Sequence, residues 1–142
     1  MSESFLEKVQ KVKELFRDCH TVEAKYQRII ELGRKQVALT AEAKNDTTLV
    51  RGCQSVLYLQ TTLSDGRLYF QTEAEALISA GLGQLLTQVY SGESPETILR
   101  NPPKYIEEME IAQTLTPGRA NGLASMYVRM KEEALRCLMR TS

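Results

Sequence analysis

Residues 55–72 read SVLYLQTTLSDGRLYFQT, and this stretch decides the fold class. Its first half is rich in valine, leucine, tyrosine and threonine, and Leu57, Leu59 and Leu63 alternate onto one face, as is typical of a β-strand. The Ser-Asp-Gly tripeptide that follows favours a tight turn, because glycine accepts the positive φ that hairpin turns need. The last six residues return as a second strand, so the stretch predicts an antiparallel hairpin.

A further short strand is predicted at Leu49–Val50, which would give a three-stranded sheet with Cys53 at a bend between strands. Apolar residues recur at helical spacing on both sides of this sheet. Helices are expected from Phe5 to near Cys19, after the N-cap Thr21, over 75–92, after Ser94-Pro95, over 104–111 and after Thr116-Pro117. Helices before and after a small antiparallel sheet predict an α+β fold, in one domain spanning residues 1–142.

Two glycine positions within the expected helices indicate close packing. Gly33 lies inside the second helix, where it would let another element approach closely. Gly81 and Gly83 form a Gly-x-Gly pair that lacks the third glycine of a dinucleotide fingerprint and does not open a helix after a strand. Helix packing is therefore favoured over phosphate binding at this pair.

Composition and charge exclude several classes of protein. The 142 residues are 42% hydrophobic and 25% charged, which is typical of a globular protein. Lysine plus arginine and aspartate plus glutamate both number 18, so no overall basic field favours nucleic acid. No apolar run approaches the roughly 20 residues that span a bilayer, and the N-terminal residues lack the apolar centre of a signal peptide. A cytoplasmic protein without membrane contact is expected.

Three cysteines are present, at positions 19, 53 and 137. An odd number without a secretory signal argues against a disulfide framework. No CxxC pair exists and His20 is the single histidine, so a four-ligand zinc site of the usual kind is hard to assemble and no metal site is predicted, with zinc held by cysteine and carboxylates together as a minor alternative. Cys19 and Cys137 fall on expected helices beside apolar stripes, where free cysteine packs as a small hydrophobe. Cys53 follows a glycine in a polar loop, and its position alone leaves a packing role and a functional role open.

A second notable cluster is LTPGRANGL at residues 115–123. Arg119 would lie in the first turn of the last helix, where a cation opposes the helix dipole at a cost of about 0.3–1 kcal/mol. A surface ion pair with a neighbouring carboxylate would explain it. Alternatively, Arg119 and the free N–H groups of this helix would face the Cys53 loop and stabilise a thiolate or persulfide anion.

The two clusters together resemble a known family. VRGCQSVLYL at 50–59 is similar to the cysteine loop of SufE-type sulfur-acceptor proteins, and LTPGRANGL resembles the motif that starts their last helix. AKYQRIIELGRK at 24–35 and ALISAGLGQLLTQVYSGESPETIL at 76–99 agree as well, so the likeness runs from about Phe5 to the end. The resemblance implies a SufE/IscU-like fold with a small three-stranded antiparallel sheet packed against helices.

The resemblance also implies an activity. SufE-type proteins accept sulfur from a pyridoxal-phosphate-dependent cysteine desulfurase of the SufS class and pass it to a downstream iron–sulfur scaffold. Cys53 would form the persulfide, Arg119 would give electrostatic or structural support, and Gly52, Gln54 and Ser55 would shape the loop. The protein would stimulate its partner desulfurase, would not itself be an enzyme and would hold no cofactor.

Further positions follow from the same comparison. The candidates for facing the partner are Arg51, Glu75, Asn121 and Gly122. The chain departs from the family pattern at Val56 and Tyr58, where glutamine and tryptophan are usual, and at Gly118, where serine is usual. These departures bear on partner affinity, whereas the cysteine and the arginine are kept. The Cys53 thiol is expected to be buried before the partner docks, which would protect it from oxidation.

Two other classes of protein fit the sequence less well. An IscU-like iron–sulfur cluster scaffold needs several ligands at one site, and only Cys53 has loop character. A cysteine-dependent hydrolase needs a base, and His20 lies beside Cys19 rather than Cys53. The sequence leaves a homodimer open.

Overall fold

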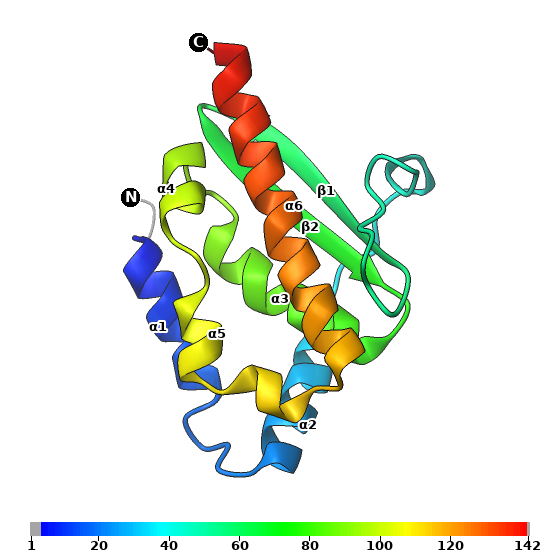
Figure 1. The fold of residues 1–142 in the computed structure, drawn as a ribbon, viewed down its shortest axis with the longest axis vertical. Helices are drawn as coiled ribbons and strands as arrows, with labels where there is room; N and C mark the ends of the chain where they lie inside the picture. The colour runs from blue at the N-terminus through cyan, green and yellow to red at the C-terminus, as the bar shows by residue number, and fades with distance from the viewer. Residues whose placement is uncertain (1–3, 142) are drawn as a thin grey trace.

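The computed structural model describes residues 4–141, so residues 1–3 and 142 of the expected domain lie outside the described part. Figure 1 shows a long C-terminal helix running beside a β-hairpin, with the remaining helices gathered around them. The elements are α1 (Phe5–Leu15), α2 (Val22–Gly33), η1 (Ala41–Ala43), β1 (Leu57–Ser64), β2 (Arg67–Ala74), α3 (Leu77–Tyr90), α4 (Pro95–Arg100), α5 (Lys104–Glu108), η2 (Ile111–Thr114) and α6 (Pro117–Thr141).

The hairpin is confirmed. β1 and β2 pair antiparallel from Leu57↔Ala74 to Ser64↔Arg67. The two turn residues between them have φ angles of 52° and 76°, which is the left-handed pair that a two-residue type I′ turn requires. In β2 alternate residues are buried and the strand packs on α3, as the sequence alternation predicted. In β1 Leu57 and Leu59 are buried, but Leu63 is 51% exposed, so the predicted alternation holds only in the first half of that strand.

The predicted third strand is wrong, because the described sheet has two strands. Leu49 makes only an isolated antiparallel bridge to Tyr58. On one side of this bridge the N–H groups of Thr48 and Leu49 donate to the Asn45 carbonyl, and on the other side the chain turns at Gly52. The segment therefore leaves the sheet edge before a second bridge can form. The α+β class stands, with a two-stranded antiparallel sheet packed against helices.

The crossing of α2 and α3 depends on two glycines. A Cβ atom on Gly81 would overlap the carbonyl oxygen of Ile29, and one on Gly33 would overlap that of Leu77. The two helix backbones thus lie in direct contact, and α3 in turn packs on β2, α1 and α6. The predicted packing role of both glycines is confirmed.

Helix caps and core agree with the local signals. Thr21 and Ser94 accept hydrogen bonds from the first turns of α2 and α4, and Pro95 and Pro117 begin α4 and α6. Cys19 and Cys137 are buried in the apolar core, which confirms their packing role. Among the described residues, no helix is both long enough and apolar enough to cross a bilayer.

Candidate functional site

The loop of residues 51–56 leaves the sheet edge and lies against the first turns of α6. Gly52 has a φ of 89°, a conformation that side chains other than glycine rarely adopt. A Cβ atom at this position would also lie 2.5 Å from the Ser125 hydroxyl oxygen on α6. Gly52 therefore turns the chain and lets the loop approach the helix closely.

The Cys53 thiol lies between this loop and α6 and is half-buried, so the expectation of a buried thiol is wrong for the isolated chain. Its Sγ lies 3.7 Å from the carbonyl oxygen of Gly122 and donates a hydrogen bond to it. A Cβ atom on Gly122 would lie 3.3 Å from Sγ, so a glycine in α6 is what admits the sulfur so close to the helix backbone. Burial raises the pKa of Cys53, and the nearby Arg119 guanidinium opposes this by lowering it. The resting loop thus holds a protonated thiol.

Arg119 extends from the first turn of α6 toward α3. Its Nη1 donates to the Ser79 hydroxyl at 2.9 Å, and the Ser55 hydroxyl donates to the same oxygen at 2.9 Å. Arg119 forms no ion pair with a carboxylate within residues 4–141, so its positive charge acts on the Cys53 loop rather than on a neighbouring acid. Of the two interpretations left open by the sequence, the geometry favours the second as far as Arg119 is concerned. Within the described residues, no N–H group of the helix donates a hydrogen bond to Cys53, whose Sγ faces the Gly122 carbonyl oxygen instead.

Ser79 was not among the residues singled out from the sequence. It is the third residue of α3, is 6% exposed and lies in the apolar first half of that helix. A polar residue on the buried face of such a helix was the available signal, because buried hydroxyls need hydrogen-bond partners. Only the folded chain shows that its partners come from the Cys53 loop and from α6.

The Gln54 side chain joins the loop to the start of α6. Its Oε1 accepts a hydrogen bond of 3.4 Å from the hydroxyl of Thr116, the residue that precedes α6. A Cβ atom on Gly118 would lie 2.5 Å from the same Oε1. The departure at Gly118 therefore has a structural consequence, since it leaves the space that the Gln54 side chain occupies.

The expected partner-facing residues surround the loop. Arg51 and Asn121 are exposed and line a groove of 640 Å³ between the loop and α6. Glu75 is exposed just after β2, and its N–H donates to the Val56 carbonyl at 3.1 Å. Gly122 differs from these, because it is buried under Cys53.

Other chemistry-bearing groups lie elsewhere. His20 is exposed between α1 and α2, and within the described residues no hydrogen bond links it to Cys53. No group of three or more His, Cys, Asp and Glu side chains in residues 4–141 is arranged to hold a metal ion. The scaffold and hydrolase alternatives therefore gain no support from the geometry.

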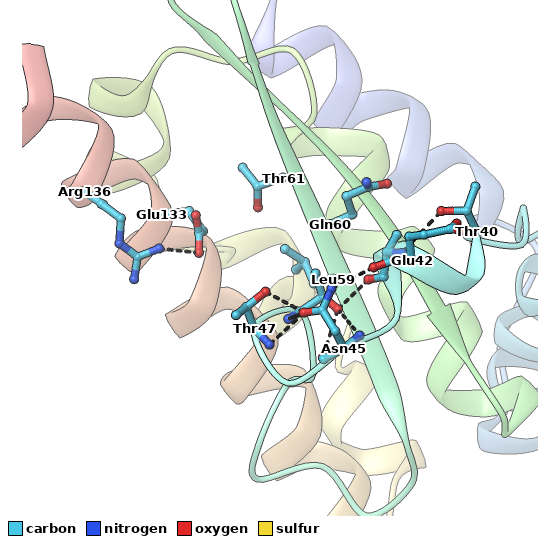
Figure 2. Close-up of a pocket in the computed structure, with 11 residues that line it drawn as sticks. Thr40, Glu42, Asn45, Thr47, Leu59, Gln60, Thr61, Glu133 and Arg136 are labelled. Carbon is cyan, nitrogen blue, oxygen red and sulfur yellow. Dashed lines mark hydrogen bonds and ion pairs between the residues drawn. The ribbon is translucent and has the colours of Figure 1, made fainter.

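A separate polar pocket of 440 Å³ lies between η1, β1 and the second half of α6 (Figure 2). On one side Arg136 and Glu133 pair with each other at 2.8 Å. On the other side the Asn45 side chain bonds to Glu42 and Thr47 within its own loop. These charged and amide side chains are thus already bonded within the pocket, which contains none of the groups around Cys53.

Fold and site together define a small α+β protein whose one loop cysteine is held beside an arginine at the start of the last helix. A sequence model described as SufE, an Fe–S metabolism associated domain, matches residues 10–134. The chain belongs to the SufE family. Membership supports a sulfur-transfer role in iron–sulfur metabolism, in which family members act as accessory proteins of cysteine desulfurases.

Individual relatives agree with this assignment. The chain is 30% identical over 125 residues to an uncharacterised SufE-like protein of Synechocystis, covering 88% of this chain and 79% of that one. It is 28% identical over 129 residues to the chloroplastic/mitochondrial SufE-like protein 1 of Arabidopsis thaliana, covering 90% of this chain. The match spans only 35% of the Arabidopsis protein's length.

The fold also matches a solved structure. The solution structure of a hypothetical protein from Thermus thermophilus superposes with a TM-score of 0.74 at 22% identity, covering 93% of this chain and 96% of that one. At this identity the likeness shows the fold alone.

Proposed function

We propose that Cys53 accepts sulfur from the persulfide of a SufS-type, pyridoxal-phosphate-dependent cysteine desulfurase and carries it to a downstream iron–sulfur scaffold. The protein stimulates its partner desulfurase by removing this sulfur, and holds no cofactor of its own. The observation that carries the proposal is the contrast among the three cysteines. Cys19 and Cys137 are packed in the core, whereas Cys53 lies in a loop beside Arg119.

The transfer is a thiol exchange. The Cys53 thiolate attacks the outer, sulfane sulfur of the donor persulfide, and a new sulfur–sulfur bond forms on Cys53. The bond to the donor cysteine breaks, and the donor sulfur leaves as a thiolate that takes up a proton. No electrons are gained or lost overall, so no external oxidant or reductant is required.

The closed loop provides a resting state for this chemistry. The attacking species is the thiolate, but the Gly122 carbonyl oxygen accepts a hydrogen bond from the thiol and would repel a thiolate. Partner docking therefore moves the loop away from Gly122 while Arg119 stabilises the anion that forms. The exposed Arg51, Glu75 and Asn121 around the loop contact the desulfurase. We expect this exchange to take place in the cytoplasm.

Intact-mass measurement tests the proposal. The protein is incubated with a SufS-type desulfurase and cysteine, and both its mass and the desulfurase turnover are recorded. One added sulfur on Cys53 and faster turnover are expected, and Cys53→Ser should lose both. Cys137→Ala is the matched control and should keep both. If the cognate desulfurase yields neither adduct nor stimulation, the proposal fails; binding of a visible cluster would instead indicate a scaffold.

A further inference from the structure

We propose that Ser79 is a positioning residue, which anchors the Arg119 guanidinium beside Cys53 and ties the Cys53 loop to α3. The inference deepens the proposed sulfur-acceptor role of Cys53 and rests on it for its biological meaning. Ser79 has no bond to Cys53, so it would act only through its two partners.

The hydrogen bonds of Ser79 match what a serine hydroxyl can accept. The oxygen has two lone pairs, and two donors reach it at 2.9 Å, one from Arg119 and one from Ser55. These donors come from α6 and from the cysteine loop, which lie 64 residues apart in the chain. The hydroxyl of Ser79 thus joins the two segments that flank Cys53 at one point on a third element.

The location of Ser79 suits an anchor. It is 6% exposed in α3, the helix that packs on β2, α1, α2 and α6. Alanine would favour the helix more than serine and would not bury a polar group. Packing and helix propensity therefore do not account for a serine at this position, whereas the two hydrogen bonds do.

Anchoring matters because arginine is long and flexible. Freed from Ser79, the guanidinium would move toward water, where a higher dielectric weakens its attraction for a Cys53 anion. The charged residues that lie near the loop are Arg51 within it, Lys44, Glu73 and Glu75 beside Val56, and Arg119, Arg129 and Glu132 on α6, whereas α3 presents the uncharged Ser79. Of these, only Arg119 shifts the pKa of Cys53, in the direction that favours the thiolate.

The pH profile of Cys53 alkylation separates the two effects of Ser79, which are to hold the Arg119 guanidinium in place and to hold the Cys53 loop against α3. Iodoacetamide modification of Cys53 is followed by mass spectrometry from pH 6 to 11. The midpoint of the profile reports stabilisation of the thiolate, and the plateau at high pH reports access to the sulfur. Neither readout needs a desulfurase, so the result stands independently of whether sulfur transfer occurs.

Distinct outcomes are expected for matched variants. Ser79→Ala should move the midpoint to higher pH, with alkylation at pH 7.5 slower by about threefold to tenfold relative to its own plateau. Ser55→Ala keeps the Ser79–Arg119 bond, so its midpoint should stay while its plateau rises. Ser79→Thr keeps the hydroxyl and should restore the wild-type midpoint. Equal thermal unfolding temperatures would show that the variants are folded.

A double-variant cycle tests whether Ser79 acts through Arg119. Arg119→Met should raise the midpoint, and adding Ser79→Ala to it should cause no further change. The inference is overturned if Ser79→Ala alone leaves the midpoint in place. It is also overturned if Ser79→Ala shifts the midpoint equally with and without Arg119, or if Arg119→Met has no effect.

Discussion

Replacing Gly122 with alanine should push the Cys53 sulfur toward solvent without unfolding the protein. The added Cβ atom would lie 3.3 Å from Sγ, 3.6 Å from Cα and 3.7 Å from Cβ of Cys53. The first contact is shorter than an optimal carbon–carbon separation of about 3.5–4.0 Å, so the loop must yield by a few tenths of an ångström. The thiol would then lose its short approach to the Gly122 carbonyl.

The stability change follows from two opposing effects. Exchanging glycine for alanine inside a helix contributes about 0.5–1 kcal/mol of stability. Overpacking costs about 1–3 kcal/mol where the neighbours are rigid, but much less where a loop can shift. Because Cys53 lies in a loop, we expect the free energy of unfolding of Gly122→Ala to stay within about 1 kcal/mol of wild type.

Two measurements check this. Urea denaturation gives the free energy of unfolding, and iodoacetamide alkylation at high pH gives the accessibility of Cys53, which should rise severalfold. Gly81→Ala is the contrasting variant. The added Cβ atom would overlap the Ile29 carbonyl oxygen between two packed helices, so the free energy of unfolding of this variant should fall by more than about 2 kcal/mol. If the free energy of unfolding of Gly122→Ala falls as much as that of Gly81→Ala and the alkylation of Cys53 is unchanged, the loop is a rigid part of the core and the reasoning is refuted.

Three further predictions concern the loop, the thiol and the core. Gly118→Ser should displace the flexible Gln54 side chain and speed Cys53 alkylation at high pH, with a change of under about 1 kcal/mol in the free energy of unfolding. Gln54→Ala should also speed the alkylation, and slower alkylation in either variant would contradict the prediction. The pKa of Cys53 is higher in the folded than in the unfolded chain, so its contribution to stability is complete below the unfolded pKa and is lost as pH rises through the folded pKa. The free energy of unfolding, measured by urea denaturation from pH 8 to 10, should therefore fall less for Cys53→Ala than for wild type. Lys8→Met should lower the free energy of unfolding by about 3–5 kcal/mol, because it leaves the buried Glu93 carboxylate without its cation. A decrease of under about 1 kcal/mol in urea denaturation would argue against a buried ion pair.

Local signals in the sequence predicted most of the fold. The Ser-Asp-Gly turn, the alternation on both sides of it and the cap-plus-proline pairs at Ser94 and Thr116 each depend on a few neighbouring residues. The third strand failed because pairing at Leu49 competes with the Asn45 turn and the bend at Gly52. That competition is decided by contacts beyond the segment itself.

Recognition of the site was uneven for a related reason. Cys53 and Arg119 could be singled out because each stands in a short motif, and the resemblance joined the two motifs. Ser79 stands in a largely apolar helix whose orientation is set by packing against several other elements, so no short pattern marks it. The effect of Gly118 likewise depends on where the Gln54 side chain lies.

The sequence by itself determined the α+β class, the hairpin and the family, and it singled out the cysteine that we propose for sulfur transfer, since these follow from periodicity, turn chemistry and motifs within short segments. Tertiary structure alone decided which residues surround that cysteine. Gly122 beneath the sulfur, Gln54 over Gly118, and Ser79 between Ser55 and Arg119 are contacts between residues 24 to 69 positions apart. Such contacts exist only once the core has placed α3 and α6 on either side of the loop.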